Sequence, residues 1–507
     1  MTVQTFEATP EARPVPFAER WRLGWRSARF WARVSRIYTS YKWMQARSRA
    51  MDALGVEREA AWQRQHETAA KAMYDLCTDM RGFLIKAGQF LATRADFLPE
   101  PFIRRLSKLH AEVEPISSEE AQQVIMRELG IARMSDYFQE FEDQPLGAAS
   151  IAQVHRARLR RGALDRARAR GMRGVAARDR RAGNGNSGEW VAIKVQYPGA
   201  EHLMMSDLAS LLILARFLQN RELPFDLESP VLELQAQIQQ EFDFVREANN
   251  TERVRDIVQR SRMLRSRVRI PQVYLARRGV MVMQYLQGMP ILRLAEEYPP
   301  PLQITARQQR AFEESLYESM SMVYGKMLLG HGFFQADPHP GNILLLESNL
   351  SRRRRLTSAL QVMLARRPSL QIGLVDFGQC KHLPSWRLAQ VRRLMKAMHQ
   401  KRGICEAFFA LGIALEHEPS YYDRNDIEVL AYSMFDTRPL PGGRKITPFG
   451  EESPLRDTPV RYLPGDLFFV LRTIQILRGL QSRMSSPKVR KISLASEWCG
   501  RHDFCGK

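Results

Sequence analysis

The chain has 507 residues, of which 44% are hydrophobic and 26% are charged. This length and composition are typical of a globular protein with a sizeable core, and they exclude a wholly disordered chain. The formal net charge of +21 favours anionic partners such as nucleotides, acidic phospholipid surfaces or nucleic acid.

A basic amphipathic helix is the first predicted element, at residues 21–47 within an N-terminal extension that we assign to residues 1–50. Its aromatic and apolar side chains recur every three or four residues and therefore share one face. These residues are Trp21, Trp25, Ala28, Trp31, Val34, Tyr38 and Tyr41. The helix can lie in a membrane interface, or it can pack this face on the body of the protein with its arginines solvated. Both interpretations stay open, and packing is slightly favoured.

A second helical region, residues 51–135, contains the sequence Lys86-Ala-Gly88-Gln89 near the end of a long periodic segment. Lys86 and Gln89 lie near one face of the predicted helix. A glycine inside a helix costs about 1 kcal/mol relative to alanine, so Gly88 indicates a packing or functional reason. Taken alone, these residues would be an ordinary helix surface.

Two features of the predicted sheet at residues 136–288 suit a bound triphosphate. A loop of small residues comes before a strand that starts at Ile151, and such a loop lets backbone amides approach a phosphate. The loop consists of Gly147, Ala148, Ala149 and Ser150. Lys194 lies in a second β-rich run among apolar neighbours, where its ammonium can pair with the α- and β-phosphates.

A lysine in this position needs a carboxylate from a helix to orient it. We predict that helix at residues 232–250, where Glu241, Asp243 and Glu247 stand beside apolar residues. Any one of these acids in isolation would be an ordinary surface carboxylate. The strand that follows the helix leads to Gln284, at the place where an acidic hinge residue is usual between two lobes.

Two arginine-rich stretches, residues 158–188 and 346–370, are predicted to be solvated insertions that loop out of the fold. No aromatic residue lies between the arginines of the first stretch to stack on bases, which argues against nucleic acid as a partner. The second stretch lies between Asn342 and Asp376, so it must loop out without disturbing either residue.

The C-terminal half, residues 289–485, contains an Asp, an Asn and a second Asp in an order that suits phosphoryl transfer. Asp337 lies in a turn-rich segment, Asn342 follows five residues later, and Asp376 precedes Phe-Gly. Asn342 and Asp376 offer the hard oxygen ligands that Mg²⁺ prefers, whereas Asp337 can polarise the nucleophile. Gln335-Ala336 replaces the His-Arg that precedes this Asp in conventional protein kinases. Residues 486–507 form a C-terminal tail.

Together these motifs resemble the UbiB (aarF-domain) family of atypical kinase-like proteins, which is associated with coenzyme Q and other isoprenoid-lipid metabolism. The resemblance covers roughly residues 70–479. It implies an α+β, bilobal, protein-kinase-like fold. The N-lobe is expected to hold a small β-sheet and added family-specific helices, and the C-lobe to be mainly helical.

The resemblance also implies roles for the residues above, with ATP and Mg²⁺ as cofactors. The catalytic set is Asp337, Lys194 and Glu247. The nucleotide-binding set is Gly147, Ala148, Ala149, Ser150, Lys194 and Gln284. The metal ligands are Asn342 and Asp376. A further set, Lys86, Gln89, Glu241 and Asp243, is expected to gate the site and to block the trench where a protein substrate would lie.

The function that the resemblance implies is ATP hydrolysis, or phosphorylation of a small or lipid-linked substrate. Expected partners are a nucleotide, an isoprenoid or quinone-precursor lipid, and an anionic membrane surface. Two alternatives stay open: a conventional protein kinase, and a nucleotide-binding pseudokinase scaffold at a membrane surface. The oligomeric state and the phosphoryl acceptor stay undetermined at this stage.

The sequence also bears on the compartment. No run of uncharged apolar residues is long enough to predict a transmembrane helix, and no secretory signal is visible. The five cysteines are scattered without paired metal-binding spacing, which favours a reducing, intracellular environment. Together with the resemblance to UbiB proteins, these features lead us to expect a protein peripheral to a membrane, in a mitochondrion or plastid.

Overall fold

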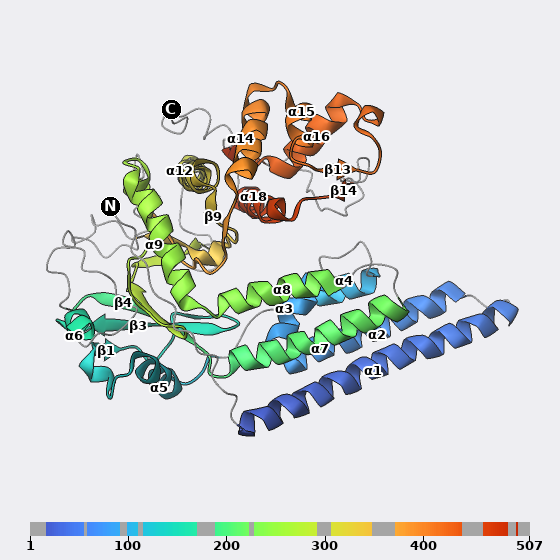
Figure 1. Ribbon diagram of the computed structural model, residues 1–507, viewed down its shortest axis with the longest axis horizontal. Helices are drawn as coiled ribbons and strands as arrows, with labels where there is room; N and C mark the ends of the chain where they lie inside the picture. The colour runs from blue at the N-terminus through green and yellow to red at the C-terminus, as the bar shows by residue number, and fades with distance from the viewer. Residues whose placement is uncertain are drawn as a thin grey trace.

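The protein consists of two lobes, of which one holds a sheet beside long helices and the other is mainly helical (Figure 1). This is the α+β kinase-like architecture that the sequence predicts. The computed structural model describes residues 17–54, 58–91, 99–109, 115–169, 188–222, 228–291, 306–346, 371–438, 460–484 and 493–494.

The N-lobe sheet is antiparallel, and the order of its strands is β1 (Phe138–Phe141), β3 (Ala152–Leu159), β4 (Trp190–Gln196), β7 (Val280–Gln284) and β6 (Val273–Ala276), with β2 (Gly147–Ala148) also paired to β3. Alternate side chains of a strand point to opposite faces of a sheet. Val191, Ile193 and Val195 of β4 accordingly join α5 (Ser118–Leu129) in one core cluster. Ala192 joins the cluster that contains the start of α9 (Phe244–Arg260). Lys194 is two residues from Ala192 along β4, so its side chain lies on the same face of the sheet, toward α9.

A group of added helices lies beside this sheet: α1 (Phe17–Leu54), α2 (Arg58–Met80), α3 (Phe83–Leu91), α4 (Glu100–Leu106), α7 (Ala200–Arg221) and α8 (Glu228–Glu241) (Figure 1). The long periodic segment predicted after residue 51 is divided between α2 and α3, because Arg81 and Gly82 both adopt positive φ, at 50° and 58°. Positive φ is incompatible with a continuous right-handed helix.

The predicted N-terminal helix is α1, and the structure divides its aromatic residues between two environments. Trp31, Val34 and Tyr41 pack against the core, as the packing interpretation expects. Trp21 and Trp25, in contrast, are each 70% exposed. The sequence could not separate these groups, because both lie on a broad apolar stripe and the position of the neighbouring helices decides which part is covered.

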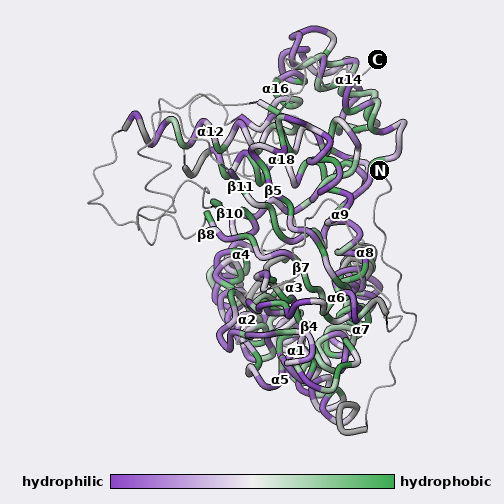
Figure 2. Tube along the Cα trace, turned by 90° about the vertical axis from the view of Figure 1, so that its left-hand side faces the viewer, coloured by the Kyte–Doolittle hydropathy of each residue, from purple (hydrophilic) through white to green (hydrophobic). Residues whose placement is uncertain are grey.

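The C-lobe core is built by α12 (Ala306–Gly325), a π-helical turn (Lys326–Gly330), α14 (Ser385–Gln400), α15 (Ile404–Phe409), α16 (Arg424–Phe435) and α18 (Gly465–Met484). Their apolar faces meet in one large cluster, while hydrophilic stretches lie outside (Figure 2). The short helix α10 (Leu264–Arg267) adds Leu264 to this core, whereas α6 (Ala163–Ala169) packs in the N-lobe cluster with α5.

Short strands carry the polar loops of the C-lobe. A four-stranded sheet has the order β5 (Val268–Arg269), β11 (Ile372–Leu374), β10 (Ile343–Leu346) and β8 (Gly288–Pro290). Two further pairs are β9 (Phe333–Gln335) with β12 (Cys380–His382), and β13 (Ala414–Leu415) with β14 (Val460–Tyr462). Because β10 and β11 are antiparallel and Ile343 lies opposite Leu374, the residues just before β10 and just after β11 are neighbours.

One predicted element is wrong as a single unit. The helix expected at residues 232–250 is two helices, since α8 ends at Glu241 and α9 starts at Phe244. The predicted insertions coincide largely with residues 170–187 and 347–370, which lie outside the described residues, as does most of the predicted tail. In the segments that the structure describes, none of the helices combines the length and the apolar character needed to cross a membrane.

Candidate active site

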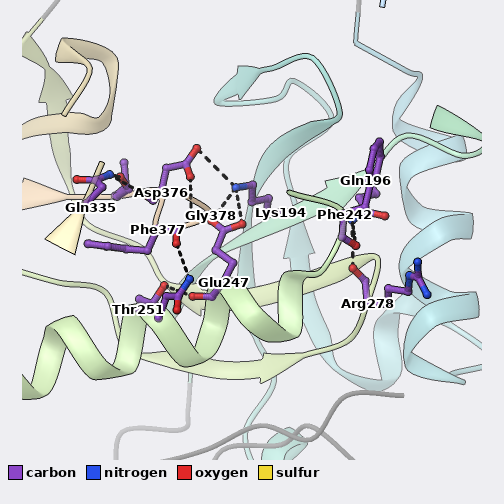
Figure 3. Close-up of polar contacts among 12 residues, drawn as sticks. Lys194, Gln196, Phe242, Glu247, Thr251, Arg278, Gln335, Asp376, Phe377 and Gly378 are labelled. Carbon is purple, nitrogen blue, oxygen red and sulfur yellow. Dashed lines mark hydrogen bonds and ion pairs between the residues drawn. The ribbon is translucent and has the colours of Figure 1, made fainter. Parts of the chain in front are cut away.

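Lys194 and Glu247 form a buried ion pair between the sheet and α9 (Figure 3). The Lys194 ammonium donates to both carboxylate oxygens of Glu247, at 2.7 Å and 2.8 Å. The two side chains are only 12% and 4% exposed. The structure therefore brings together the strand lysine and the helix acid that the sequence predicts as partners.

The electrostatics of this pair follow from its burial and from a third charge. Burial alone would lower the pKa of Lys194, but the carboxylates of Asp376, Glu247 and Glu241 outweigh it, so the pKa lies above its usual value. Burial raises the pKa of Glu247, whereas the adjacent ammonium lowers it. Burial and the nearby Asp376 charge outweigh the ammonium, so the pKa of Glu247 lies above its usual value.

Asp376 follows β11 and faces Lys194 from the other lobe, with its Oδ2 3.7 Å from the Lys194 Nζ. Its side chain is 44% exposed, so its oxygens are open to a ligand. The backbone of Asp376 adopts a φ of 67°, which is unfavourable for a residue other than glycine and needs support from its surroundings. Its Oδ1 accepts a hydrogen bond from the Gly378 amide at 3.2 Å.

Two side chains that the sequence did not assign to the site hold this turn in place. Gln335 of β9 donates its amide to the backbone carbonyl of Asp376, and Tyr324 donates its hydroxyl to Gln335 at 2.5 Å. Asn250 of α9 donates to the Phe377 carbonyl at 3.0 Å. Gln335 was noted only as a replacement for His-Arg, and its position two residues before Asp337 was the one available signal.

The loop that carries Asp337 and Asn342 is closed by its own backbone. The His339 amide donates to the Asp337 carbonyl at 2.8 Å, and the Asn342 amide donates to the His339 carbonyl at 2.9 Å. The Asn342 carbonyl in turn accepts from the Val375 amide at 3.0 Å. This last bond fixes Asn342 beside the residue that precedes Asp376, so the structure brings the two predicted metal ligands to adjacent strand ends.

Asp337 also has a partner that no local sequence signal could reveal. Arg472 of α18 places its Nη2 3.5 Å from the Asp337 Oδ2, across 135 residues of chain. The side chains are 36% and 29% exposed, so the pair lies at the edge of the site and not inside the core.

The small-residue loop is the turn of a β-hairpin on the strand next to Lys194. Gly147 pairs with Val154, which itself pairs with Lys194 on the next strand. The Ala149 amide closes the hairpin by donating to the Ala152 carbonyl at 2.8 Å. This amide is therefore occupied within the turn, and the contact of the loop with a phosphate stays a prediction.

Gln284 is the last residue of β7, where the chain leaves the N-lobe sheet for β8 of the C-lobe sheet. Its amide donates to the Gln272 carbonyl at 2.7 Å, and its side chain is half-buried. This is the connection between the lobes at which the sequence places it.

The predicted gating residues have different surroundings. Glu241 accepts a hydrogen bond from the Gln379 side chain at 2.8 Å, which links the end of α8 to the segment after Asp376. Asp243 is the N-cap of α9, because its Oδ1 accepts from the amides of Val245 and Arg246 at 3.0 Å and 3.1 Å. A gating role for these acids stays a prediction.

Lys86 and Gln89 lie in α3, but their side chains are outside the part of the chain that the structure describes. Gly88 between them has a packing reason. A Cβ there would lie 2.5 Å from the Leu109 Cδ1 and 3.0 Å from the Cys77 Sγ. The close approach of α2 and of the segment after α4 therefore favours glycine at this position.

The polar groups at this site fit a magnesium–nucleotide complex in their chemistry. Asn342 and Asp376 supply an amide oxygen and a carboxylate, which are hard ligands of the kind Mg²⁺ uses with substrate phosphates and water. Within the described residues, no group of three or more His, Cys, Asp or Glu side chains could hold a metal alone.

Comparison with known proteins decides the family. The model described as "ABC1 atypical kinase-like domain" matches residues 108–165 and 181–404, which is more than half of the chain. The chain belongs to the ABC1 atypical kinase-like family. The matched residues include Lys194, Glu247, Asp337, Asn342 and Asp376, but not Lys86, Gln89 or Arg472.

Relatives of this ABC1 chain carry names that confirm the resemblance to UbiB and aarF proteins. "AarF domain-containing protein kinase 1" of Xenopus laevis is 30% identical over 285 residues, which are 56% of this chain and 47% of that protein. "Probable protein kinase UbiB" of Pseudomonas paraeruginosa is 33% identical over 275 residues, which are 53% and 44%. The matches thus span about half the length of these curated relatives or less.

A solved structure supports the ABC1 fold. The structure of Rv3197 in complex with erythromycin, from Mycobacterium tuberculosis, covers 87% of this chain and 97% of its own, with a TM-score of 0.52. At 18% identity this likeness shows the fold alone.

Proposed function

We propose that this chain binds Mg-ATP between its lobes and transfers the γ-phosphoryl group to water or to a small, lipid-linked hydroxyl acceptor. The observation that supports this most is the convergence of Lys194, Glu247 and Asp376 from three separate elements. The Lys194 ammonium lies within 3.7 Å of both acids, as an arrangement that holds phosphates and a cation together requires.

In the proposed mechanism each residue has a separate task. Lys194, braced by Glu247, orients the α- and β-phosphates. Asn342 and Asp376 would hold Mg²⁺, which neutralises phosphate charge when bound. Asp337 accepts the proton of the acceptor hydroxyl as the new oxygen–phosphorus bond forms and the bond to the β–γ bridging oxygen breaks.

The acceptor class follows from the resemblance to UbiB proteins and not from the geometry. We propose an isoprenoid or quinone-precursor lipid, and thus a role in coenzyme Q or related lipid metabolism. A relative from Arabidopsis thaliana, 32% identical over 296 residues, is named "Protein ACTIVITY OF BC1 COMPLEX KINASE 7, chloroplastic". A plastid or mitochondrial location of this chain, peripheral to a membrane, is part of the same proposal.

The test separates metal binding from turnover. We expect Asp376→Asn to abolish the Mg-dependent thermal stabilisation by ATP, because a metal ligand is lost. Asp337→Ala should keep that stabilisation and lower phosphate release by about 100-fold or more, the usual contribution of a general base. Glu406→Gln, in an exposed ion pair with Arg424 on the C-lobe, is the control and should change neither quantity.

Unchanged stabilisation in Asp376→Asn would contradict the metal assignment. Phosphate incorporated into added protein would favour a conventional protein kinase. Nucleotide binding without turnover in the unaltered chain, with and without quinone-precursor mimics, would favour a scaffold.

A further inference from the structure

The charged residues on the inner face of α1 are neutralised by its neighbours. Arg26 pairs with Asp207 of α7 at 2.7 Å, and the Asp207 side chain is only 4% exposed. Arg33 pairs with Asp79 of α2 at 2.6 Å, and Lys42 pairs with Glu222 at the end of α7 at 2.7 Å. The positive charges of these three residues are therefore neutralised within the protein.

The outer face of α1 is different. Trp21, Trp25 and Trp43 are 70%, 70% and 62% exposed. Arg29 and Arg36 are exposed beside them, and within the described ranges neither forms an ion pair. We call these five residues the outer face of α1.

Helix geometry places the outer face on one continuous strip. At 100° per residue, the three tryptophans fall within about 40° around the axis, and Arg29 and Arg36 border them within about 40° more. At 1.5 Å per residue, Trp21 and Trp43 are roughly 33 Å apart along the axis. Small or short residues such as Ala28, Ala32 and Thr39 lie between these anchors and leave the strip flat.

The position of α1 leaves this strip accessible. It runs along the lower edge of the molecule in Figure 1, with α2 and α7 on its inner side. A planar surface can therefore contact its whole length. A globular protein partner would meet a narrow convex ridge and bury little area there.

We propose that the outer face of α1 docks on an anionic phospholipid bilayer, with the helix parallel to the membrane plane. The tryptophan rings would lie at headgroup level and the arginines would contact lipid phosphates, as in interfacial amphipathic helices. The occupant is lipid because the strip combines exposed aromatic anchors with unpaired positive charge. This inference rests on the peripheral membrane location proposed above, and not on the proposed phosphoryl transfer.

The test uses the full chain and sedimentation with vesicles. Vesicles contain equal parts of phosphatidylcholine and phosphatidylglycerol, with pure phosphatidylcholine vesicles for comparison. Each arginine near an anionic leaflet is worth about fivefold in binding, so Arg29→Gln with Arg36→Gln should weaken binding to the anionic vesicles roughly 30-fold. Trp21→Ala with Trp25→Ala should weaken it about tenfold or more.

The matched control is Trp386→Ala with Arg393→Gln on α14, where Trp386 is 56% exposed and Arg393 is exposed. This control should bind like the unaltered chain, and thermal melting should show that all variants are folded. Equal binding by the α1 variants and the unaltered chain would overturn the proposal. So would equal loss in the α14 control, or a change in oligomeric state in the α1 variants without any vesicle binding by the unaltered chain.

Discussion

At the scale of single residues, the site depends on groups whose conformations are unfavourable alone and are held by specific partners. Asp376 at a φ of 67° is kept by hydrogen bonds from Gln335 to its carbonyl and from Asn250 to the next carbonyl. A non-glycine residue in this region costs on the order of 1–2 kcal/mol, comparable to the one or two net hydrogen bonds that oppose it. The turn is therefore stable only when both supports are present.

A buried histidine in the N-lobe makes the stability of the protein sensitive to acid. His155 is fully buried, its Nδ1 donates to the Glu142 carbonyl at 2.9 Å, and its Nε2 accepts from the Gln153 amide at 2.7 Å. Gln153 also donates to the Ile116 carbonyl at 3.1 Å, so its amide group is fully used. If His155 were protonated, its Nε2–H donor would face the N–H donor of the Gln153 side-chain amide.

The pKa of His155 is correspondingly lowered from 6.5, by burial first, against the opposing effects of the Glu142 carbonyl and the Asp143 charge. Above 6.5 the imidazole is neutral in both states and contributes its full stability. As the pH falls below 6.5, the unfolded chain binds the proton more readily, so the free energy of unfolding decreases until the folded pKa is reached.

We expect His155→Gln to reduce this acid-dependent loss of stability between about pH 5 and 7, where histidine titrates. Urea unfolding at several pH values measures it, and the same substitution at the exposed His417 is the control. An equal slope in the unaltered chain and in His155→Gln would contradict the prediction.

At the scale of elements, the break between α8 and α9 positions the Glu247 carboxylate. Asp243 caps α9, and Glu247 follows one turn later, with its own amide bonded to the Asp243 carbonyl at 3.1 Å. Asp243→Ala should cost about 1 kcal/mol of stability, the usual loss for an N-cap, and should weaken Mg-ATP binding because Glu247 shifts.

The isosteric variant separates capping from gating. Asp243→Asn keeps a capping oxygen but removes the charge, so we expect it to behave like the unaltered chain in both urea unfolding and nucleotide affinity. Asp423→Ala, at the N-cap of α16, should lose stability without an effect on nucleotide affinity. If Asp243→Asn instead resembles Asp243→Ala in nucleotide affinity alone, the carboxylate acts through its charge.

These elements show how far the sequence could predict the site. Lys194 and Asp376 were predicted from the residue types that phosphate and magnesium chemistry requires, whereas Glu247 was chosen among three nearby acids because of the resemblance to UbiB proteins. The break at Asp243 was missed because Phe242 and Val245, three residues apart, continue a helical apolar spacing across it. Arg472 could not be predicted at all, since its approach to Asp337 depends on how α18 packs.

At the scale of the whole molecule, α9 is the element that the two lobes share. Phe244, Val245 and Ala248 in its first half belong to the N-lobe core, whereas Val254, Ile257 and Val258 in its second half belong to the C-lobe core. Polar contacts follow the same path, because Asn250 near the middle of the helix bonds to the Phe377 carbonyl. The helix therefore links the N-lobe core to the turn that carries Asp376.

The strength of this coupling is open to measurement by hydrogen exchange. Asn250→Ala removes the bond to Phe377, worth about 1 kcal/mol, so the amides of residues 375–379 should exchange roughly five times faster. Residues 424–435 of α16 belong to the C-lobe core but not to this path, so their exchange should stay unchanged. Uniform acceleration in both segments would mean that the substitution loosens the whole lobe, and no acceleration would mean that Gln335 alone holds the turn. Asn250 bonds to the backbone next to Asp376, so its loss should let the Asp376 carboxylate shift. We therefore expect faster exchange to be accompanied by weaker Mg-ATP binding, and saturating Mg-ATP to restore slow exchange.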